Sequence, residues 1–157
     1  MADNTASPIA IVGMSCRVAG ANSPSKLWEV LCESKDVQSE IRRFSADGFY
    51  REDGGKRKGL ANVRRGYFMD GGVDRFDNAF FSIPPTEAKA MDPQQRLLLE
   101  LTYEALENAG IPLNKFVGTN TGVYTGMTWN DYGISLFRDV DMTPKYMSTG
   151  ACNAIAC

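Results

Sequence analysis

The sequence predicts an α/β fold in which buried strands alternate with helices. A short apolar run at residues 8–12 and the segment 121–126 are strand candidates, and between them the segment from Asp92 to Gly110 follows a helical repeat. Strands that alternate with helices are typical of layered α/β domains. The composition is that of a globular protein, since 43% of the 157 residues are hydrophobic and 23% are charged. This length predicts a single domain.

The first strand is predicted at Pro8–Val12. This run is rich in β-branched side chains and is closed by Gly13. Because the run is apolar at successive positions, both of its faces are apolar, which is typical of a strand covered by other elements on both sides.

The first helix is predicted from about Pro24 to Glu33. Ser23 is a favourable N-cap residue, and proline suits the first helical position. The apolar side chains within the helix form a stripe that would face a core. They are Leu27, Trp28, Val30 and Leu31.

Residues 36–66 follow no regular pattern, and aromatic residues come after them. The segment 51–59 is polar, glycine-rich and basic, so an anion patch is one interpretation. Its acidic residues, Glu52 and Asp53, dilute the charge, and a solvated surface loop is the favoured interpretation. The aromatic residues at 67–68 and within 76–81 predict irregular structure anchored to a core by its rings, with an aromatic ligand box as the alternative.

The clearest predicted element is a helix that begins after Asp92. Asp92 can act as the N-cap, Pro93 occupies the first helical position, and Gln95 completes a capping-box pattern. Gly110 suits the left-handed residue that follows a helix, and Pro112 blocks continuation. Two adjacent apolar stripes predict that this helix is the most buried of the chain and is covered on more than one side. The stripes are Leu98, Leu101, Ala105 and Ala109, and then Leu99, Tyr103 and Leu106.

Three further elements are predicted towards the C-terminus: a strand at Thr121–Gly126 and helices at Asn130–Phe137 and Lys145–Cys157. The glycines at positions 118, 122 and 126 match neither the G-x-G-x-x-G nor the G-x₄-G-K-[ST] pattern, so they do not indicate a nucleotide site. Glycines within a strand more often allow another backbone to approach closely.

The charge balance and the N-terminus argue against two classes of partner. Lys plus Arg number 17 and Asp plus Glu number 19, so the net charge is −2. A general nucleic-acid binder would need a basic excess. No apolar run approaches the ~20 residues that span a bilayer, and the N-terminus does not have the pattern of a signal peptide. The chain is therefore predicted to be cytoplasmic, with no nucleic acid or membrane as partner, and its cysteines are predicted to be thiols.

The sequence contains no histidine. A Ser-His-Asp or Cys-His catalytic pair within this chain is therefore excluded, and so is a zinc site with histidine ligands. Four cysteines are present, but their spacing argues against a metal site, because the nearest two, Cys152 and Cys157, are separated by four residues and no C-x₂-C pair occurs.

Several segments together resemble the N-terminal part of a β-ketoacyl synthase, the condensing domain of type I polyketide synthases. The most specific is Met91–Glu100, Met-Asp-Pro-Gln-Gln-Arg-Leu-Leu-Leu-Glu. The others occur in the order expected of the family: Ile9–Arg17 with Gly20, Leu27–Trp28, Phe76–Asp77, Phe80–Phe81, Glu87–Ala88, Glu104–Gly110 and Thr121–Val123. The amino-acid sequences of Asn62–Arg64 and Thr102–Asn108 are most similar to those of fungal iterative, reducing synthases.

The resemblance implies the first portion of a thiolase-like, layered condensing-enzyme fold, with residues 1–157 as an incomplete N-terminal fragment and no second domain. It implies that the parent domain is an acyltransferase that performs a decarboxylative Claisen condensation. The substrates would be acyl and malonyl thioesters, and the malonyl unit would be carried by the phosphopantetheine arm of an acyl carrier protein. The family is dimeric, so a homodimer is expected.

Two departures from the family pattern affect these expectations. Pro84-Pro85-Thr86 replaces the usual Ser-Pro-Arg, so the helix expected there lacks its serine cap. The family's nucleophilic cysteine and its two catalytic histidines belong to motifs absent here, and Ser148–Ala156 resembles the segment shortly before the nucleophile. We therefore predict no catalytic, cofactor-binding or metal-binding residue in this chain, which would be inactive alone.

The four cysteines are interpreted as packing residues. Cys152 and Cys157 are predicted to be small buried residues of a close-packed helix, because neither has a basic neighbour in sequence that would lower its thiol pKa. Cys16, which follows the first predicted strand, is interpreted as structural, and Cys32 as a packing residue of the first helix.

The apolar ending, Ala154–Cys157, predicts that the protein continues beyond this stretch, because natural termini are usually polar and exposed. Two alternatives remain open. One is a self-contained, non-catalytic α/β interaction module. The other is the condensing domain of a type I fatty acid synthase.

Overall fold

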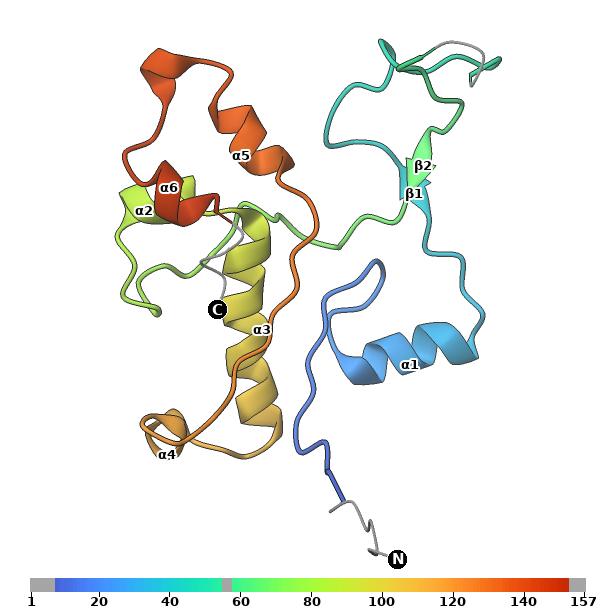
Figure 1. Cartoon of the computed structure of the whole chain (residues 1–157). Helices are drawn as coiled ribbons and strands as arrows, with labels where there is room; N and C mark the ends of the chain where they lie inside the picture. The colour runs from blue at the N-terminus through green and yellow to red at the C-terminus, as the bar shows by residue number, and fades with distance from the viewer. Residues whose placement is uncertain (1–7, 55–57, 153–157) are drawn as a thin grey trace, which may run out of the picture. The chain divides into compact units, whose positions relative to one another are not determined.

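The computed structural model describes residues 8–54 and 58–152 (Figure 1). The chain divides into two compact units. One consists of residues 16–71, and the other combines residues 1–15 with residues 72–157. Helices account for most of the regular structure in the described residues, and the strands that occur there are very short.

The unit of residues 16–71 contains helix α1, Pro24–Cys32. The Ser23 side chain accepts a hydrogen bond from the backbone amide of Lys26, and Pro24 is the first helical residue, so the predicted helix start is confirmed. The apolar stripe is only partly covered, because Val30 is buried whereas Trp28 is 66% exposed. A 2.7 Å bond to Glu29 raises the pKa of Lys26 on the solvated side.

The same unit contains a small antiparallel sheet that the sequence patterns did not predict. Strand β1, Ser39–Glu40, pairs with strand β2, Arg65–Gly66. The Arg43 guanidinium donates to the carbonyl oxygen of Met69 at 2.8 Å, next to the end of this pairing. The described residues of the predicted surface loop, 51–54 and 58–59, are almost all exposed, as predicted.

The second unit is mainly helical (Figure 1). Its described elements are α2 (Pro85–Ala90), α3 (Pro93–Asn108), α4 (Leu113–Phe116), α5 (Asp131–Leu136), the 3₁₀ helix η1 (Val140–Met142) and α6 (Met147–Gly150). Helix α2 forms without a side-chain cap at Pro84, because Pro85 supplies a favourable first helical residue. The predicted helix near 130–137 is confirmed by α5.

Both ends of α3 are fixed by local sequence. At the start, Asp92 Oδ1 accepts a hydrogen bond from the backbone amide of Gln94 at 2.8 Å. At the end, Gly110 has φ 67°, and the amides of Gly110 and Ile111 donate to the carbonyl oxygens of Glu107 and Leu106. These two bonds are the Schellman arrangement, so the predicted termination is confirmed.

Helix α3 packs against other segments on two sides. The Ser15 hydroxyl donates to the carbonyl oxygen of Leu101 at 2.6 Å, and Gly13 lies against Ala105 and Ala109. Elsewhere on α3, the Phe80 ring meets Tyr103 edge-on at 4.8 Å between centroids. The prediction of contacts on more than one side is confirmed, and most α3 side chains are half-buried.

The phenylalanines of residues 76–81 form a small aromatic cluster. Phe76 and Phe81 stack at 5.3 Å between ring centroids, and Phe80 meets Phe81 edge-on at 5.0 Å. Since Phe80 also contacts Tyr103 of α3, these rings anchor an irregular segment to a helix, as predicted.

The two predicted strands are absent from the described structure. Ile9 is 97% exposed and Tyr124 is 96% exposed, and neither Pro8–Val12 nor Thr121–Gly126 is paired with another strand. The prediction of buried strands is wrong here for a physical reason. A strand requires a hydrogen-bonded neighbour, and no other described segment pairs with either run.

The last predicted helix, Lys145–Cys157, is also much shorter than expected. Only Met147–Gly150 is helical, and residues 153–157 lie outside the described residues. The backbone leaves the helical conformation at Ala151, where φ is −116°.

Candidate functional site

Most of the buried side chains of the described chain gather where α2, α3 and α6 meet. Ala90 at the end of α2 is fully buried, and Asp92 and Gln95 at the start of α3 are 2% and 6% exposed. The other buried side chains here are Met91, Met147 and Ala151. We call these residues, together with Gly150, the α2–α3–α6 junction.

Two hydrogen bonds join the start of α3 to the last residue of α6 and to the segment just after it. The backbone amide of Asp92 donates to the carbonyl oxygen of Gly150 at 2.7 Å. The side-chain amide of Gln95 donates from Nε2 to the carbonyl oxygen of Cys152 at 3.1 Å. Gln95 is therefore engaged with a segment 57 positions away in sequence, and the capping-box role predicted for it is wrong. The adjacent Gln94 is the residue whose side chain reaches back to Asp92.

The junction also contains polar atoms without a partner. Asp92 Oδ2 and Arg96 Nε are buried, and neither has a hydrogen-bond partner among the described residues. A buried polar atom without a partner costs about 1–3 kcal/mol. The start of α3 therefore carries one free acceptor and one free donor in addition to the bonds that hold residues 150–152.

Close backbone approach gives the junction its shape. A Cβ atom on Gly150 would overlap the backbone of Ala90 and would lie 2.8 Å from the amide nitrogen of Met91. Helix α5 adds a further contact, since the Tyr132 hydroxyl donates to the carbonyl oxygen of Lys89 at 2.6 Å. The α2 backbone is thus contacted by α5 and by α6.

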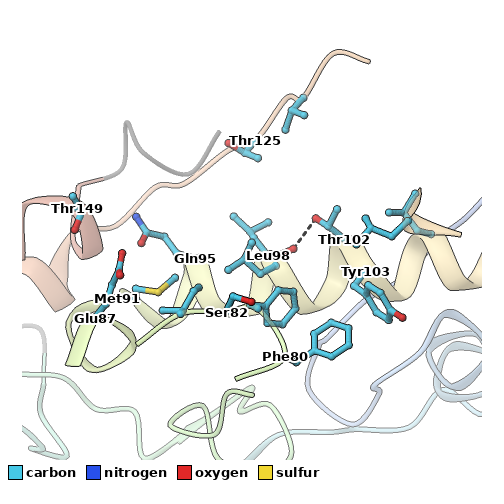
Figure 2. A pocket seen from close by; sticks show the side chains of 16 residues that line it. Phe80, Ser82, Glu87, Met91, Gln95, Leu98, Thr102, Tyr103, Thr125 and Thr149 are labelled. Carbon is cyan, nitrogen blue, oxygen red and sulfur yellow. Dashed lines mark hydrogen bonds between the residues drawn. The ribbon is translucent and has the colours of Figure 1, made fainter. Parts of the chain in front are cut away.

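A cavity of about 840 Å³ lies along α3 (Figure 2). Figure 2 shows Gln95, Leu98 and Thr102 along the helix, with Phe80 and Ser82 on one side and Thr125, from an extended segment, on the other. Ten of the sixteen lining residues are apolar or aromatic, which makes this surface suited to apolar contact. The polar residues among them are Ser82, Glu87, Gln95, Thr102, Thr125 and Thr149.

The side chains of this cavity do not supply a nucleophile of the condensing type. None of the lining residues is a cysteine, and Glu87 is the one carboxylate among them. A covalent acyl intermediate requires a thiolate or another activated nucleophile. The described lining therefore offers an apolar contact surface and no thiol.

The described cysteines are scattered rather than gathered into a site. Cys16 is half-buried, whereas Cys32 and Cys152 are exposed, and Cys157 lies outside the described residues. The predicted burial of Cys152 is wrong because α6 ends at Gly150, two residues earlier. The predicted packing role of Cys32 is also wrong, since two residues turn an α-helix by about 200°, which places Cys32 opposite the buried Val30.

In residues 8–54 and 58–152, no three His, Cys, Asp or Glu residues are placed to hold a metal ion. Over the same residues, no helix has both the length and the apolar character needed to cross a bilayer.

Comparison with solved structures identifies the class of the fold. The ketosynthase from module 6 of the bacillaene synthase of Bacillus subtilis 168 superposes with a TM-score of 0.77 at 32% sequence identity. The match covers 94% of this chain and 23% of that chain. The chain thus has the fold of the first part of a condensing enzyme, as the sequence predicted.

Comparison with protein families identifies the family itself. Residues 6–157 match the β-ketoacyl synthase N-terminal domain, and the chain belongs to this family. Curated relatives include Fusarin C synthetase of Gibberella moniliformis, which is 51% identical over 99% of this chain. Another is the highly reducing polyketide synthase acrA of Aspergillus aculeatus, which is 52% identical over 96% of this chain. The chain spans 4% and 6% of the length of these two relatives, and the name of the second agrees with the predicted similarity to fungal reducing synthases.

The contact between Gln95 and residue 152 is the site feature that the sequence patterns missed. A signal was present, because Gln95 lies on the same side of the helix as Leu98, Leu99 and Leu106, where an apolar residue would be expected. A polar residue on an apolar stripe indicates that its side chain has a specific partner.

Proposed function

We propose that this chain is part of a polyketide synthase condensing domain, to which it contributes scaffold rather than catalytic residues. Residues 1–157 would form one continuous N-terminal portion of that domain, with no second domain among them. The single observation that best supports the proposal is the family match over residues 6–157.

The parent domain would act as a β-ketoacyl synthase, an acyltransferase. An acyl group is held as a thioester on a cysteine thiolate. The carbon–carbon bond to the carboxylate of a malonyl thioester breaks, CO₂ leaves, and the electron pair on the α-carbon attacks the acyl carbonyl. The cysteine thiolate is then released, and the β-ketoacyl product remains on the carrier. Stabilising the enolate and the tetrahedral intermediate requires positioned hydrogen-bond donors.

The residues of this chain support a scaffold role. It contains no histidine, and Cys152, which comes shortly before the expected nucleophile segment, is exposed and lies outside the lining of the apolar cavity. We propose that no residue here is catalytic and that none binds a cofactor or metal. The chain alone would therefore be inactive.

The partners proposed for the parent domain follow from this chemistry. They are acyl and malonyl thioesters, an acyl carrier protein with its phosphopantetheine arm, and a second copy of the domain in a homodimer. The proposed location is the cytoplasm. The names of the curated relatives favour a polyketide over a fatty acid synthase, since the two described above are a highly reducing polyketide synthase and Fusarin C synthetase.

A domain replacement tests the proposal. The matching 154-residue segment of the highly reducing polyketide synthase acrA would be exchanged for residues of this chain, and the chimera is called the host synthase here. After priming with an acyl thioester, mass spectrometry of the carrier protein would measure extension by malonyl thioester. The negative control is a chimera in which the host's nucleophilic cysteine is replaced by alanine.

We expect the host synthase to extend the acyl chain and the control to leave it unchanged. A monodisperse host synthase with a cooperative melting transition and no extension would overturn the proposal. That outcome would favour the self-contained interaction module instead.

A further inference from the structure

We propose that Gln95 is a positioning residue for the condensation, because its side-chain amide fixes the direction in which the chain leaves α6. This inference rests on the proposed function, since it concerns the segment that leads towards the expected nucleophile. The observation that carries it is the 3.1 Å hydrogen bond from Gln95 Nε2 to the carbonyl oxygen of Cys152.

Two hydrogen bonds hold the backbone of residues 150–152, and together they fix the direction in which this backbone runs. The Asp92 amide donates to Gly150, and the Gln95 side chain donates to Cys152. A single bond would act as a pivot about which the chain could turn. Two bonds, placed two residues apart on one backbone and donated by one rigid helix start, remove that freedom.

Burial makes the Gln95 contact specific. Gln95 is 6% exposed and is surrounded by the other buried residues of the α2–α3–α6 junction. A leucine would fill a similar volume without the cost of removing an amide from water. The presence of a buried amide at this position is explained by its bond to a backbone carbonyl that no helix or strand of the described residues uses.

A short helix does little by itself to fix the direction of the residues that follow it. Helix α6 has four residues, and a helix of that length has little stability of its own. The direction of residues 151–152 therefore depends on tertiary contacts. Those contacts are the two hydrogen bonds and the close approach of Gly150 to Ala90.

The consequence for catalysis is geometric. Residues 148–152 belong to the segment that resembles the approach to the nucleophile, so a change in their direction would move the thiolate relative to its substrates. Misplacement of a reacting group by about 1 Å can lower a rate about 100-fold. The expected loss is in kcat, because Gln95 is buried and its side chain bonds to the backbone of this chain rather than facing solvent, from which a carrier would approach.

The test compares three variants in the host synthase. Gln95→Leu removes the amide at similar volume, and Gln95→Glu removes the donor at neutral pH but restores it when the carboxyl group is protonated. Ser135→Ala is the control. It also removes a side chain that donates to a backbone carbonyl, but the Ser135 hydroxyl donates within α5, to Tyr132 at 2.7 Å, and Ser135 is not part of the cavity lining. The measurements are kcat, KM for the malonyl carrier, the melting temperature, and hydrogen exchange of residues 147–152.

We expect Gln95→Leu to lower kcat by roughly 10–100-fold, to leave KM within about twofold, and to speed hydrogen exchange at residues 150–152. Ser135→Ala should leave all four quantities near those of the unchanged host. The activity of Gln95→Glu relative to the unchanged host should rise as the pH falls from about 7.5 to about 5.5, because burial raises the pKa of a carboxyl group.

Equal losses of kcat in Gln95→Leu and Ser135→Ala would overturn the inference. A Gln95→Glu variant whose activity relative to the unchanged host is the same at both pH values would also overturn it, even if Gln95→Leu fails to fold. Failure of the proposed function is a separate outcome, recognised by a folded but inactive unchanged host.

Discussion

The backbone carbonyl of Ala90 occupies the position that a Cβ atom on Gly150 would need. Ala90 ends α2 and Gly150 ends α6, so the two helices approach each other through backbone atoms rather than side chains. Ala90 is fully buried, and its carbonyl group cannot move towards solvent to make room. Because Gly150 has no side chain, α6 can pack directly against the backbone of α2.

Gly150→Ala is expected to destabilise the host synthase by about 1–3 kcal/mol, as overpacking of a well-packed site does. The loss arises because the new methyl group meets backbone atoms that cannot rotate away. The free energy of unfolding in urea would measure it. Gly126→Ala is the control, since a Cβ there meets nothing within 4 Å. Equal stabilities of the two variants would show that α2 and α6 can separate without cost.

Gly110→Ala is expected to cost about 1–2 kcal/mol for a different reason. A Cβ at this position would also meet nothing within 4 Å, but Gly110 has φ 67°, which an L residue adopts at a conformational cost. Comparison with Gly126→Ala by thermal melting isolates that cost, because both positions are open and only Gly110 is left-handed. If the two variants melt at the same temperature, the left-handed conformation of Gly110 imposes no conformational cost on an alanine there.

Leu101→Ala is expected to cost about 2–5 kcal/mol in the host synthase, as truncation of a packed leucine does. Leu101 lies on the side of α3 whose backbone receives the Ser15 hydroxyl. Thr102, which is next to Leu101 in sequence, is exposed and provides the matched control. Thr102→Ala should change the free energy of unfolding by less than about 0.5 kcal/mol. Denaturant titration measures both. A loss below about half a kcal/mol for Leu101→Ala would mean that this side of α3 is not a packing surface.

The chain alone is expected to show no condensing activity. It has no imidazole to assist decarboxylation, and its described thiols lie outside the lining of the apolar cavity. Purified chain would be incubated with an acyl thioester and malonyl carrier protein, and β-ketoacyl product would be measured by mass spectrometry. Product that is lost in Cys152→Ala or Cys157→Ala would contradict the scaffold role.

The chain alone is also expected to self-associate. Large apolar side chains are exposed in several segments, with Ile9 97%, Tyr124 96% and Trp129 75% exposed. Exposed apolar surface of this kind favours association with other chains. Size-exclusion chromatography and thermal unfolding would measure the outcome, and a monodisperse monomer with a sharp transition would favour the self-contained module.

Helix ends could be predicted from sequence because their determinants are local. Asp92, Pro93 and Gly110 set the limits of α3 through bonds to residues at most a few positions away. The predicted start of α1 at Ser23 and Pro24 is confirmed for the same reason. The family resemblance rested on these same residues and their neighbours, and the comparisons confirm it.

Strands and the candidate site could not be predicted in the same way. Pro8–Val12 has the composition of a buried strand, yet a strand depends on a distant neighbour that composition does not specify. The Gln95 side chain could reach its own helix start or another segment, and the capping-box pattern favoured the wrong partner. Its real acceptor lies 57 residues away, a distance at which short patterns carry no information.

The hydrogen bond between Ser15 and Leu101 also has a consequence for synthesis on the ribosome. The two residues are 86 positions apart. At roughly 5–20 residues per second, Ser15 is made roughly 4–17 s before its acceptor. During that interval the Ser15 hydroxyl has no acceptor on α3. The contact between the two segments therefore forms only after about half of the chain has followed Ser15 out of the ribosome, so it does not guide the earliest folding of the N-terminal residues.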